Sequence, residues 1–550
     1  MKKEDVKYLV FEGGGGKGSV YLGALVALED LRILPIRPLK RTVSKNHIPY
    51  YLEKIDGPLI GIAGSSAGAI TALALSMGMT SSDLASEMAN QEQFLDFFDQ
   101  PKQKNEKNNC EQRIKSVEDD LLSNYKRSRG IKLTNIKDLG WGASTALSFL
   151  RKNRDERSAL NRILNRITMN TSPNSCYKQK RTLYTRTSQT GEIYPDQGLI
   201  FENHVQQLLY GSGLFPAFGS RTFFKSLLLR YLFGFDPLLV QTVLVNEENG
   251  ILNRLIGNVG LKQYLINNKQ YINDLEMLKK LKDGTQNTYW EKLLTDPTMF
   301  FGYLMNLPFS EFFYLTGVDL KITGCNVSRS APRIFSRDYT PLFPVIEAVG
   351  ISMNIPVLFS PIAVRCNVTD DIWFNNIVRM SKAPNITCRE YNNQYKGLYI
   401  DGGMQLNYPI HLFNTTYDNP FEEYALIERR IKTLPFNKNV LGFQLDLNDN
   451  TTVTLEKDQD VFKELEWSNY AGKLIESIMF YSEKGQIIDS NVKKNTITLD
   501  TKGIGTLDFA PSRRIAEEPI KKAYRETING LLKDKLPEDH LNAVIRLLAQ

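Results

Sequence analysis

Apolar residues along the first hundred positions follow two patterns that predict strands, each followed by a helix. Val6 to Glu12 is a short apolar run typical of a buried strand, and Ser19 to Glu29 carries apolar residues at helical spacing. The apolar run that begins at Leu59 predicts a second strand, then a sharp turn and a small-residue helix that ends near Gly78. This order of elements is typical of an α/β protein.

Strand patterns return in the second half of the chain. A helix stopped by proline and a short apolar turn are expected over Ala348 to Pro361. Amphipathic helices are expected from about Ile515 to Ala549. The later strands are Asp319 to Val327, Leu398 to Asp401, Val440 to Asp446 and a hairpin-like Thr496 to Asp500.

Two further stretches are expected to be helical. Thr80, Ser81, Ser82 and Asp83 offer N-caps for a helix over Leu84 to Phe98. Gly213 to Leu315 is apolar and aromatic and mostly helical by pattern. Part of it is a candidate lining for an acyl-chain pocket, although core packing explains most of its residues individually.

Composition limits the class of protein. The 550 residues suffice for two or three ordinary domains or for one large α/β domain with insertions, and 42% hydrophobic residues fit a sizeable core. The cysteines show no paired spacing, so neither a zinc site nor a disulfide framework is expected, and a reducing compartment is the simplest interpretation. They are Cys110, Cys176, Cys325, Cys366 and Cys388.

The net charge of +7 is unevenly distributed. Lys102 to Arg181 holds 19 Lys and Arg against 8 Asp and Glu, an excess of 11 that is larger than that of the whole chain. Such a block suits anionic lipid or nucleic acid, but a solvated insertion over about 100–197 is the favoured interpretation. One helix, Thr145 to Ile167, is expected within it.

No targeting or membrane segment is expected. The chain enters its first strand almost directly after Met1, without the apolar run of a signal peptide. The most apolar stretch, Phe223 to Val245, is interrupted by Lys225, Arg230, Asp236 and Pro237, which argues against a membrane-spanning helix. We therefore expect a soluble chain.

The motif Gly64-Ser65-Ser66-Ala67-Gly68 lies between the second strand and its helix. Gly64 and Gly68 remove the Cβ atoms that would collide across the turn, so Ser66 can take a strained conformation with its hydroxyl projecting from the sheet edge. The start of the following helix points N–H groups at the same place. Ser66 is the candidate nucleophile, with an ordinary strand-to-helix turn as the competing interpretation.

A glycine loop follows the first strand and is suited to binding a negative charge. It lacks the Gly-Lys-Ser/Thr ending of a phosphate loop, and the dinucleotide pattern needs an acidic residue where Arg37 to Arg41 stands. An oxyanion hole serving Ser66 explains the loop better. The candidate oxyanion residues are Gly13, Gly14, Gly15, Gly16, Lys17 and Gly18.

The third motif is Asp401-Gly402-Gly403, with Asn407 and Pro409 just beyond. An aspartate at a strand end, fixed by Gly402 and Gly403, can present one carboxylate in a cleft. The four histidines, His47, His204, His411 and His540, lack the setting of a catalytic base, and a structural role is favoured for His411. The alternative is a dyad in which Asp401 acts on Ser66 as general base.

In this order the three motifs resemble those of the patatin-like phospholipases. The resemblance implies a three-layer αβα sandwich with a mainly parallel central sheet over residues 1–510, with insertions at about 100–197 and 220–315 and a C-terminal helical segment at 511–550. It implies a phospholipase A or lysophospholipase that uses Ser66, Asp401 and the glycine loop, and no metal or cofactor. Gly350 stands where an arginine is common in the family, so that arginine's role does not transfer.

The Ile351-Ser352-Met353 segment and the late Asp500 to Ile504 segment look most like the bacterial branch that includes the effectors ExoU and VipD. The resemblance implies a phospholipid membrane surface as substrate and a host activator such as ubiquitin or a small GTPase. It also implies a cytoplasmic protein, or one delivered into a host cytosol to act at membranes. No nucleic-acid partner is expected. The alternatives are a catalytically silent lipid- or partner-binding protein and a nucleotide-binding protein.

Overall fold

The structure is a computed structural model of the 550-residue chain, and it describes part of the sequence. The predicted basic insertion, its helix at Thr145 to Ile167, His47 and His204 lie outside the described residues. The described residues are 1–34, 39–40, 51–52, 59–89, 193–195, 213–215, 217–235, 237–246, 297–341, 343–366, 389, 395–414, 436–446, 490–504, 513–532 and 536–548.

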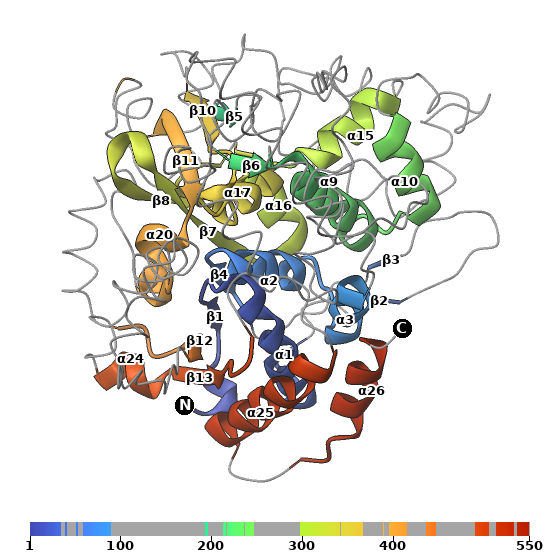
Figure 1. Cartoon of the computed structure of the whole chain (residues 1–550), viewed down its shortest axis with the longest axis vertical. Coiled ribbons are helices and arrows are strands. Elements are labelled where there is room, and N and C mark those ends of the chain that lie inside the picture. Colours follow the sequence, from blue (N-terminus) through green and yellow to red (C-terminus); the bar gives the residue numbers. More distant parts are fainter. Residues whose placement is uncertain are drawn as a thin grey trace, which may run out of the picture.

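One nine-stranded sheet forms the centre of the molecule (Figure 1). Five neighbouring strands are parallel, in the order β13 (Thr496–Asp500), β12 (Val440–Asp446), β1 (Tyr8–Phe11), β4 (Gly61–Gly64) and β7 (Asp319–Asn326). The sheet continues from β7 with antiparallel strands, and β8 also pairs with β7. These are β11 (Gly397–Asp401), β10 (Ile362–Cys366), β5 (Ile193–Pro195) and β8 (Ala331–Phe335).

Two short ladders lie outside this sheet: β2 (Leu39–Lys40) pairs with β3 (Tyr51–Leu52), and β6 (Gly213–Phe215) pairs with β9 (Val357–Phe359). The described helices are α1 (Tyr21–Asp30), α2 (Ala67–Ser76), α3 (Ser81–Ala89), α9 (Phe218–Leu227), α10 (Pro237–Asn246), α15 (Pro297–Met305), α16 (Phe309–Thr316), α17 (Val345–Ser352), α20 (Gly403–Leu406), α24 (Ser490–Lys494), α25 (Arg513–Leu531) and α26 (Asp539–Leu547). Short segments of tighter or wider helix are η1 (Lys3–Asp5), η2 (Gly15–Val20), η5 (Leu228–Leu232), η6 (Val327–Arg329) and η7 (Ile410–Phe413).

Side chains of the parallel strands alternate between two cores, one on each face of the sheet. In β1, Leu9 and Phe11 enter the larger core, whereas Val10 enters the smaller one. In β4, Ile62 and Ala63 divide in the same way. This is the period of two that a strand buried on both faces requires.

Helices cover both faces, so the molecule has three layers. The larger core includes residues of α1, α2, α17 and α25, and the smaller core is closed by α20, η7 and α24. Figure 1 shows α20 and α24 on one side of the central strands and α1, α2 and α3 on the other. The predicted α/β sandwich is confirmed, with the antiparallel strands beyond β7 added to its parallel centre.

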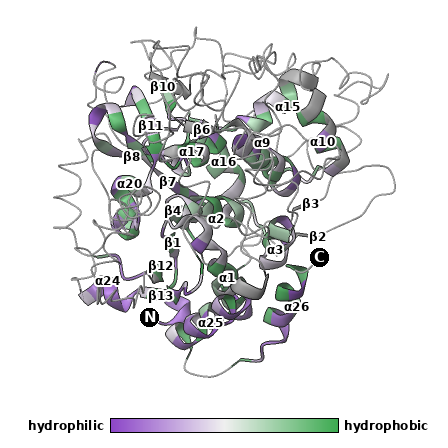
Figure 2. Cartoon of the chain, viewed as in Figure 1, coloured by the Kyte–Doolittle hydropathy of each residue, from purple (hydrophilic) through white to green (hydrophobic). Residues whose placement is uncertain are grey.

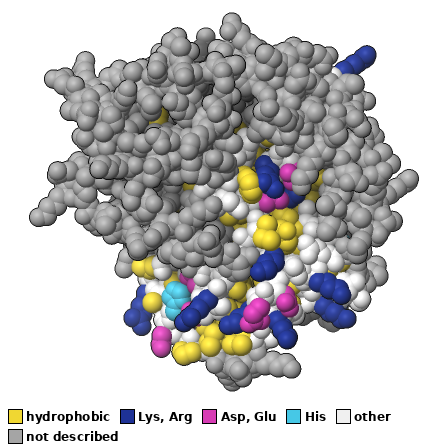
Figure 3. Space-filling view, turned by 180° about the vertical axis from the view of Figure 1, so that it is seen from behind, with side chains coloured by type: hydrophobic (Ala, Val, Ile, Leu, Met, Phe, Trp, Pro, Cys, Tyr) yellow, Lys and Arg dark blue, Asp and Glu magenta, His cyan; other side chains and the backbone are white. Residues whose placement is uncertain are grey.

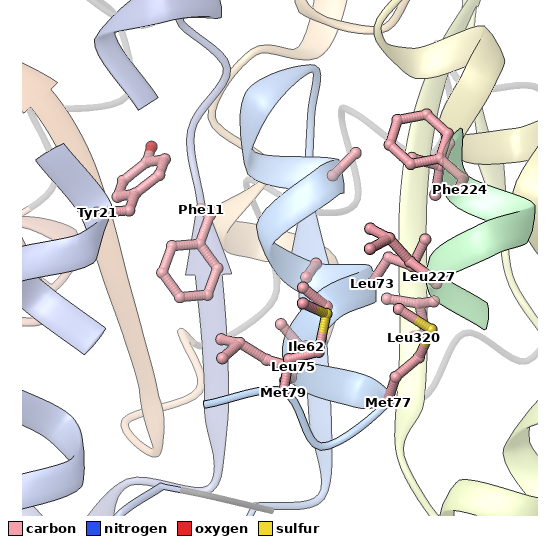
Figure 4. Close-up of a cluster of buried hydrophobic side chains, with 14 of the residues drawn as sticks. Phe11, Tyr21, Ile62, Leu73, Leu75, Met77, Met79, Phe224, Leu227 and Leu320 are labelled. Carbon is pink, nitrogen blue, oxygen red and sulfur yellow. The ribbon is translucent and has the colours of Figure 1, made fainter. Parts of the chain in front are cut away.

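The larger core explains the apolar sequence of the helices beside the strands. Figure 4 shows side chains from β1, α2, β7 and α9 meeting in it, among them Phe11, Leu73 and Phe224. Phe11 also packs edge-on against Tyr21, with ring centroids 5.2 Å apart. Figure 2 shows hydrophobic residues concentrated in these inner helices and hydrophilic residues on α24, α25 and α26.

Several predicted boundaries move. The strand expected to be hairpin-like, Thr496 to Asp500, is instead a parallel edge strand beside β12. The helix expected over Ala348 to Pro361 begins at Val345 and ends at Ser352, and β9 occupies the apolar turn. Helix α3 begins at Ser81 because Asp83 N–H donates to Thr80 Oγ1 at 3.2 Å and Thr80 N–H donates to Asp83 Oδ2 at 3.0 Å.

Candidate active site

Ser66 occupies the turn between β4 and α2. Its backbone has φ 49° and ψ −121°, a conformation that is rare for a residue with a side chain. The flanking glycines make the turn possible, because a Cβ on Gly64 would lie 2.1 Å from the Gly68 carbonyl oxygen and one on Gly68 would lie 2.3 Å from the Phe11 carbonyl oxygen. The turn is therefore a strained elbow that directs one serine toward the strand ends.

Asp401, the last residue of β11, lies directly opposite this serine. Ser66 Oγ donates to Asp401 Oδ2 at 2.7 Å, and Gly403 N–H donates to Asp401 Oδ1 at 2.7 Å. Both side chains are buried, with Ser66 2% exposed and Asp401 0%. The structure thus brings together two residues that are far apart in the sequence.

The pKa of Asp401 is displaced toward neutrality. Burial raises this pKa to about 7, and the hydrogen bonds from Ser66 and Gly403 act in the opposite direction because they stabilise the carboxylate. A carboxyl group with a pKa near 7 can both accept and return a proton at neutral pH.

The glycine loop packs against the serine. A Cβ on Gly13 would lie 2.9 Å from Ser66 Cβ and 2.3 Å from Asn407 Oδ1, so this position has no space for a side chain. The Gly13 N–H donates to the Asn407 carbonyl oxygen at 3.1 Å, and Asn407 Nδ2 donates to the Gly13 carbonyl oxygen at 3.0 Å. Asn407 therefore fixes the two peptide groups that flank the Gly13 Cα.

The loop then turns into η2. Lys17 N–H donates to the Gly14 carbonyl oxygen at 3.1 Å, and Gly15 has φ 55°. The amides of Gly14, Gly15 and Gly16 have no hydrogen-bond acceptor among the residues that the structure describes. These three are consequently the amides of the loop that remain open to an incoming negative charge.

Two buried residues to which the sequence assigned no role in the site support it. Glu12, at the end of β1, accepts the Leu445 N–H at 2.5 Å and lies 3.4 Å from Asn407 Nδ2. Ser352 Oγ accepts the Ser66 N–H at 3.0 Å. The only sequence signal for either was position, since Glu12 precedes the glycine loop and Ser352 lies in the helix before the Asp401 motif.

The histidines of the described chain have other partners. His411 Nδ1 lies 3.0 Å from Asn414 Nδ2, and His540 Nδ1 lies 2.8 Å from Asp30 Oδ1. Within the described residues, no hydrogen bond joins a histidine to Ser66 or Asp401. The base nearest to the serine hydroxyl is the Asp401 carboxylate.

Gly350, where the resemblance would have placed an arginine, faces an arginine from another helix. Arg221 of α9 places its Cγ 2.9 Å from where a Cβ on Gly350 would be. The guanidinium of this buried arginine forms an ion pair with Glu347 of α17 at 2.9 Å, and its Nε donates to the Ala217 carbonyl oxygen. Arg221 therefore holds α17 and α9 together.

Comparison with known proteins identifies the family. The family model described as patatin-like phospholipase matches residues 9–414, which contain most of β1, the Ser66 elbow and the Asp401 motif. The chain belongs to the patatin-like phospholipase family. The chain is also similar to a probable lipid hydrolase 463L of Invertebrate iridescent virus 6, at 26% identity over 107 residues, which are 20% of this chain and 27% of that relative.

The crystal structure of VipD from Legionella pneumophila is also similar. The alignment covers 96% of this chain and 66% of that one, at 16% identity and a TM-score of 0.32. A TM-score this low carries no inference about the branch of the family, so the effector role remains a prediction. Among the described residues of this patatin-like chain, no helix is both long and apolar enough to cross a membrane.

Proposed function

We propose that this patatin-like protein is a lipid acyl hydrolase of the phospholipase A or lysophospholipase type, with Ser66 as nucleophile and Asp401 as general base. The observation that carries the proposal is the 2.7 Å hydrogen bond from Ser66 Oγ to Asp401 Oδ2. Membership of the family and the lipid hydrolase named among the relatives support the substrate class.

In acylation, Ser66 Oγ attacks the carbonyl carbon of the ester and its proton passes to Asp401. The carbonyl oxygen becomes an oxyanion, for which the amides of Gly14, Gly15 and Gly16 are the proposed donors. When the tetrahedral intermediate collapses, the C–O bond to the lipid alcohol breaks and that oxygen takes the proton from Asp401. The products of this step are a lysolipid or glycerol derivative and an acyl-serine.

Deacylation repeats the sequence with water. Asp401 accepts a proton from the attacking water, a second tetrahedral intermediate forms, and the proton returns to Ser66 Oγ as the fatty acid leaves. A pKa near 7 suits both directions of transfer, because the carboxylate is available and its conjugate acid is not too weak. The rate is therefore expected to rise with pH up to about 7 and then level off.

The test is fatty-acid release from mixed phospholipid vesicles by wild type, Ser66→Ala and Asp401→Asn. We expect both variants to lose at least about a thousandfold in kcat, because the nucleophile or its base is absent. Ser86→Ala, which removes an exposed serine on α3, is the matched control and should retain wild-type activity. Activity that survives in Ser66→Ala would contradict the proposal.

A eukaryotic cell extract, added in a parallel series, tests the finer predictions. Activity that appears only with extract supports a host activator, such as ubiquitin or a small GTPase, and the effector role. Folded wild-type protein that is inactive in both series would instead support a silent lipid- or partner-binding protein. A thermal shift with nucleotides distinguishes the nucleotide-binding alternative, against which the packing of Gly13 on Ser66 counts.

A further inference from the structure

We propose that Ser352 is a positioning residue that sets the distance between Ser66 and Asp401. Its hydroxyl accepts the Ser66 N–H at 3.0 Å, and its own carbonyl oxygen accepts the Gly402 N–H at 3.2 Å. Two residues later, the Asn354 carbonyl oxygen accepts the Asp401 N–H at 3.0 Å. One short turn thus contacts the backbone on both sides of the proposed dyad.

The hydrogen bond from the Ser66 N–H to the Ser352 hydroxyl is made by the residue whose backbone is strained. The elbow has φ 49° and ψ −121°, a strained conformation that persists only when surrounding contacts hold it. Ser352 is 0% exposed, so its hydroxyl is shielded from bulk water. Without this hydroxyl, the Ser66 amide is a buried donor without a partner, and the strained conformation of the elbow becomes less favourable.

The turn itself is held rigidly. Ser352 is the last residue of α17, and the buried pair Arg221–Glu347 ties this helix to α9 at 2.9 Å. The N–H of Met353 donates to the Val349 carbonyl oxygen at 3.1 Å, which continues the helical bonding past Ser352. Because the end of α17 is fixed in this way, the Ser352 hydroxyl can hold the elbow in position.

The inference rests on the proposed function, and a pH profile separates positioning from general stability. The hydrogen bond from Ser66 lowers the pKa of Asp401, so an elbow that moves away from the carboxylate should raise that pKa further. The acidic limb of the pH–rate profile, where activity rises as Asp401 loses its proton, would then move to higher pH. If Ser352 mattered only for stability, its substitution would leave the position of this limb unchanged.

The experiment compares wild type with Ser352→Ala and Ser352→Cys in vesicle hydrolysis across pH 5 to 9 and in labelling of Ser66 by a fluorophosphonate. We expect Ser352→Ala to lower kcat about 10- to 100-fold at unchanged KM, to slow labelling equally, and to move the acidic limb to higher pH. Ser352→Cys keeps the shape of the side chain, with a somewhat larger atom that is a weaker acceptor. Its kcat should fall between those of wild type and Ser352→Ala, and it serves as the second variant if Ser352→Ala does not fold.

Ser76→Ala is the matched control, since Ser76 is also fully buried and its hydroxyl donates to the Ala72 carbonyl oxygen at 2.7 Å at the far end of α2. It should lose stability without a shift of the acidic limb. The inference would be overturned if folded Ser352 variants kept the wild-type kcat and the wild-type acidic limb, or if the acidic limb shifted equally in Ser76→Ala. Either result would leave the proposed function standing. An inert, unlabelled wild type would overturn the proposed function and this inference with it.

Discussion

Ionisation of the buried Asp401 side chain lowers the free energy of unfolding. Its pKa is raised from an ordinary value of 3.8 to about 7, so the folded protein retains a proton that the unfolded chain releases. The stability that this group contributes is full below pH 4, falls as the pH rises from about 4 to 7, and is absent above that range. Above pH 7 the buried carboxylate therefore destabilises the fold.

We expect Asp401→Asn, which removes this charge, to be more stable than wild type at pH 8, by an amount on the order of 2 to 4 kcal/mol. The difference should narrow as the pH falls toward 4. Urea unfolding at several pH values measures it. Asp539→Asn, which removes an exposed carboxylate from α26, is the control for the loss of a surface charge. An Asp401→Asn variant that is less stable than wild type at pH 8 would contradict the expectation.

Residues within a contiguous motif could be predicted from the sequence, whereas their supports could not. Ser66 and the glycines around it reveal the elbow because the steric demand is local. Asn407 and Ser352 act through contacts with Gly13 and Ser66, which lie hundreds of positions away. Such contacts depend on strand order, and one sequence does not specify it.

At the scale of elements, helix α1 approaches α25 more closely than side chains allow. A Cβ on Gly23 would lie 1.9 Å from the Ile520 carbonyl oxygen and 3.0 Å from the Tyr524 amide nitrogen. Because these are backbone atoms of a helix, neither can rotate away. Gly23 is thus the residue that sets the spacing of the two helices.

We expect Gly23→Ala to lower the free energy of unfolding by about 2 to 3 kcal/mol, since the helices must separate and the core between them loosens. Gly530→Ala is the matched control in α25, because its Cβ would meet only the Ile497 side chain, at 3.0 Å, and alanine favours the helix. Urea unfolding of both variants checks the expectation. Equal effects of the two substitutions would show that the close approach does not matter.

The existence of most described elements could be predicted from periodicity, but their pairing could not. The strand Thr496–Asp500 carries the right alternation, yet its position as a parallel edge beside β12 depends on α25, which packs against it. The antiparallel strands β10 and β11 lie beyond β7 for the same kind of reason. Hydrophobic patterns report which face is buried and not which neighbour covers it.

At the scale of the whole molecule, the C-terminal helices share the main core. Ile520, Tyr524 and Val544 are buried in the same cluster as the central strands. Polar contacts add to this, because Asp30 of α1 accepts the Tyr524 hydroxyl at 2.7 Å and pairs with His540 at 2.8 Å. Figure 3 shows Lys, Arg, Asp and Glu side chains interspersed on the lower part of the rear face, the end of the molecule at which Figure 1 places α25 and α26.

We therefore expect removal of residues 511–550 to abolish the cooperative thermal transition and to cause association, because it uncovers a continuous apolar surface of the core. Calorimetry and size-exclusion chromatography test this. The double variant Lys522→Ala, Arg525→Ala keeps the helices and removes only exposed ion pairs, so its melting temperature should stay near that of wild type. A truncated chain that melts cooperatively would contradict the expectation.

The strand order also determines when the sheet can form. β1 lies between β4, which ends at residue 64, and β12, which begins at residue 440. A ribosome that adds 5–20 residues per second needs about 20 to 90 s to make the roughly 430 residues from β1 to β12. During that time one edge of β1 is an open template for another nascent chain, so synthesis is the period in which this protein is most exposed to aggregation.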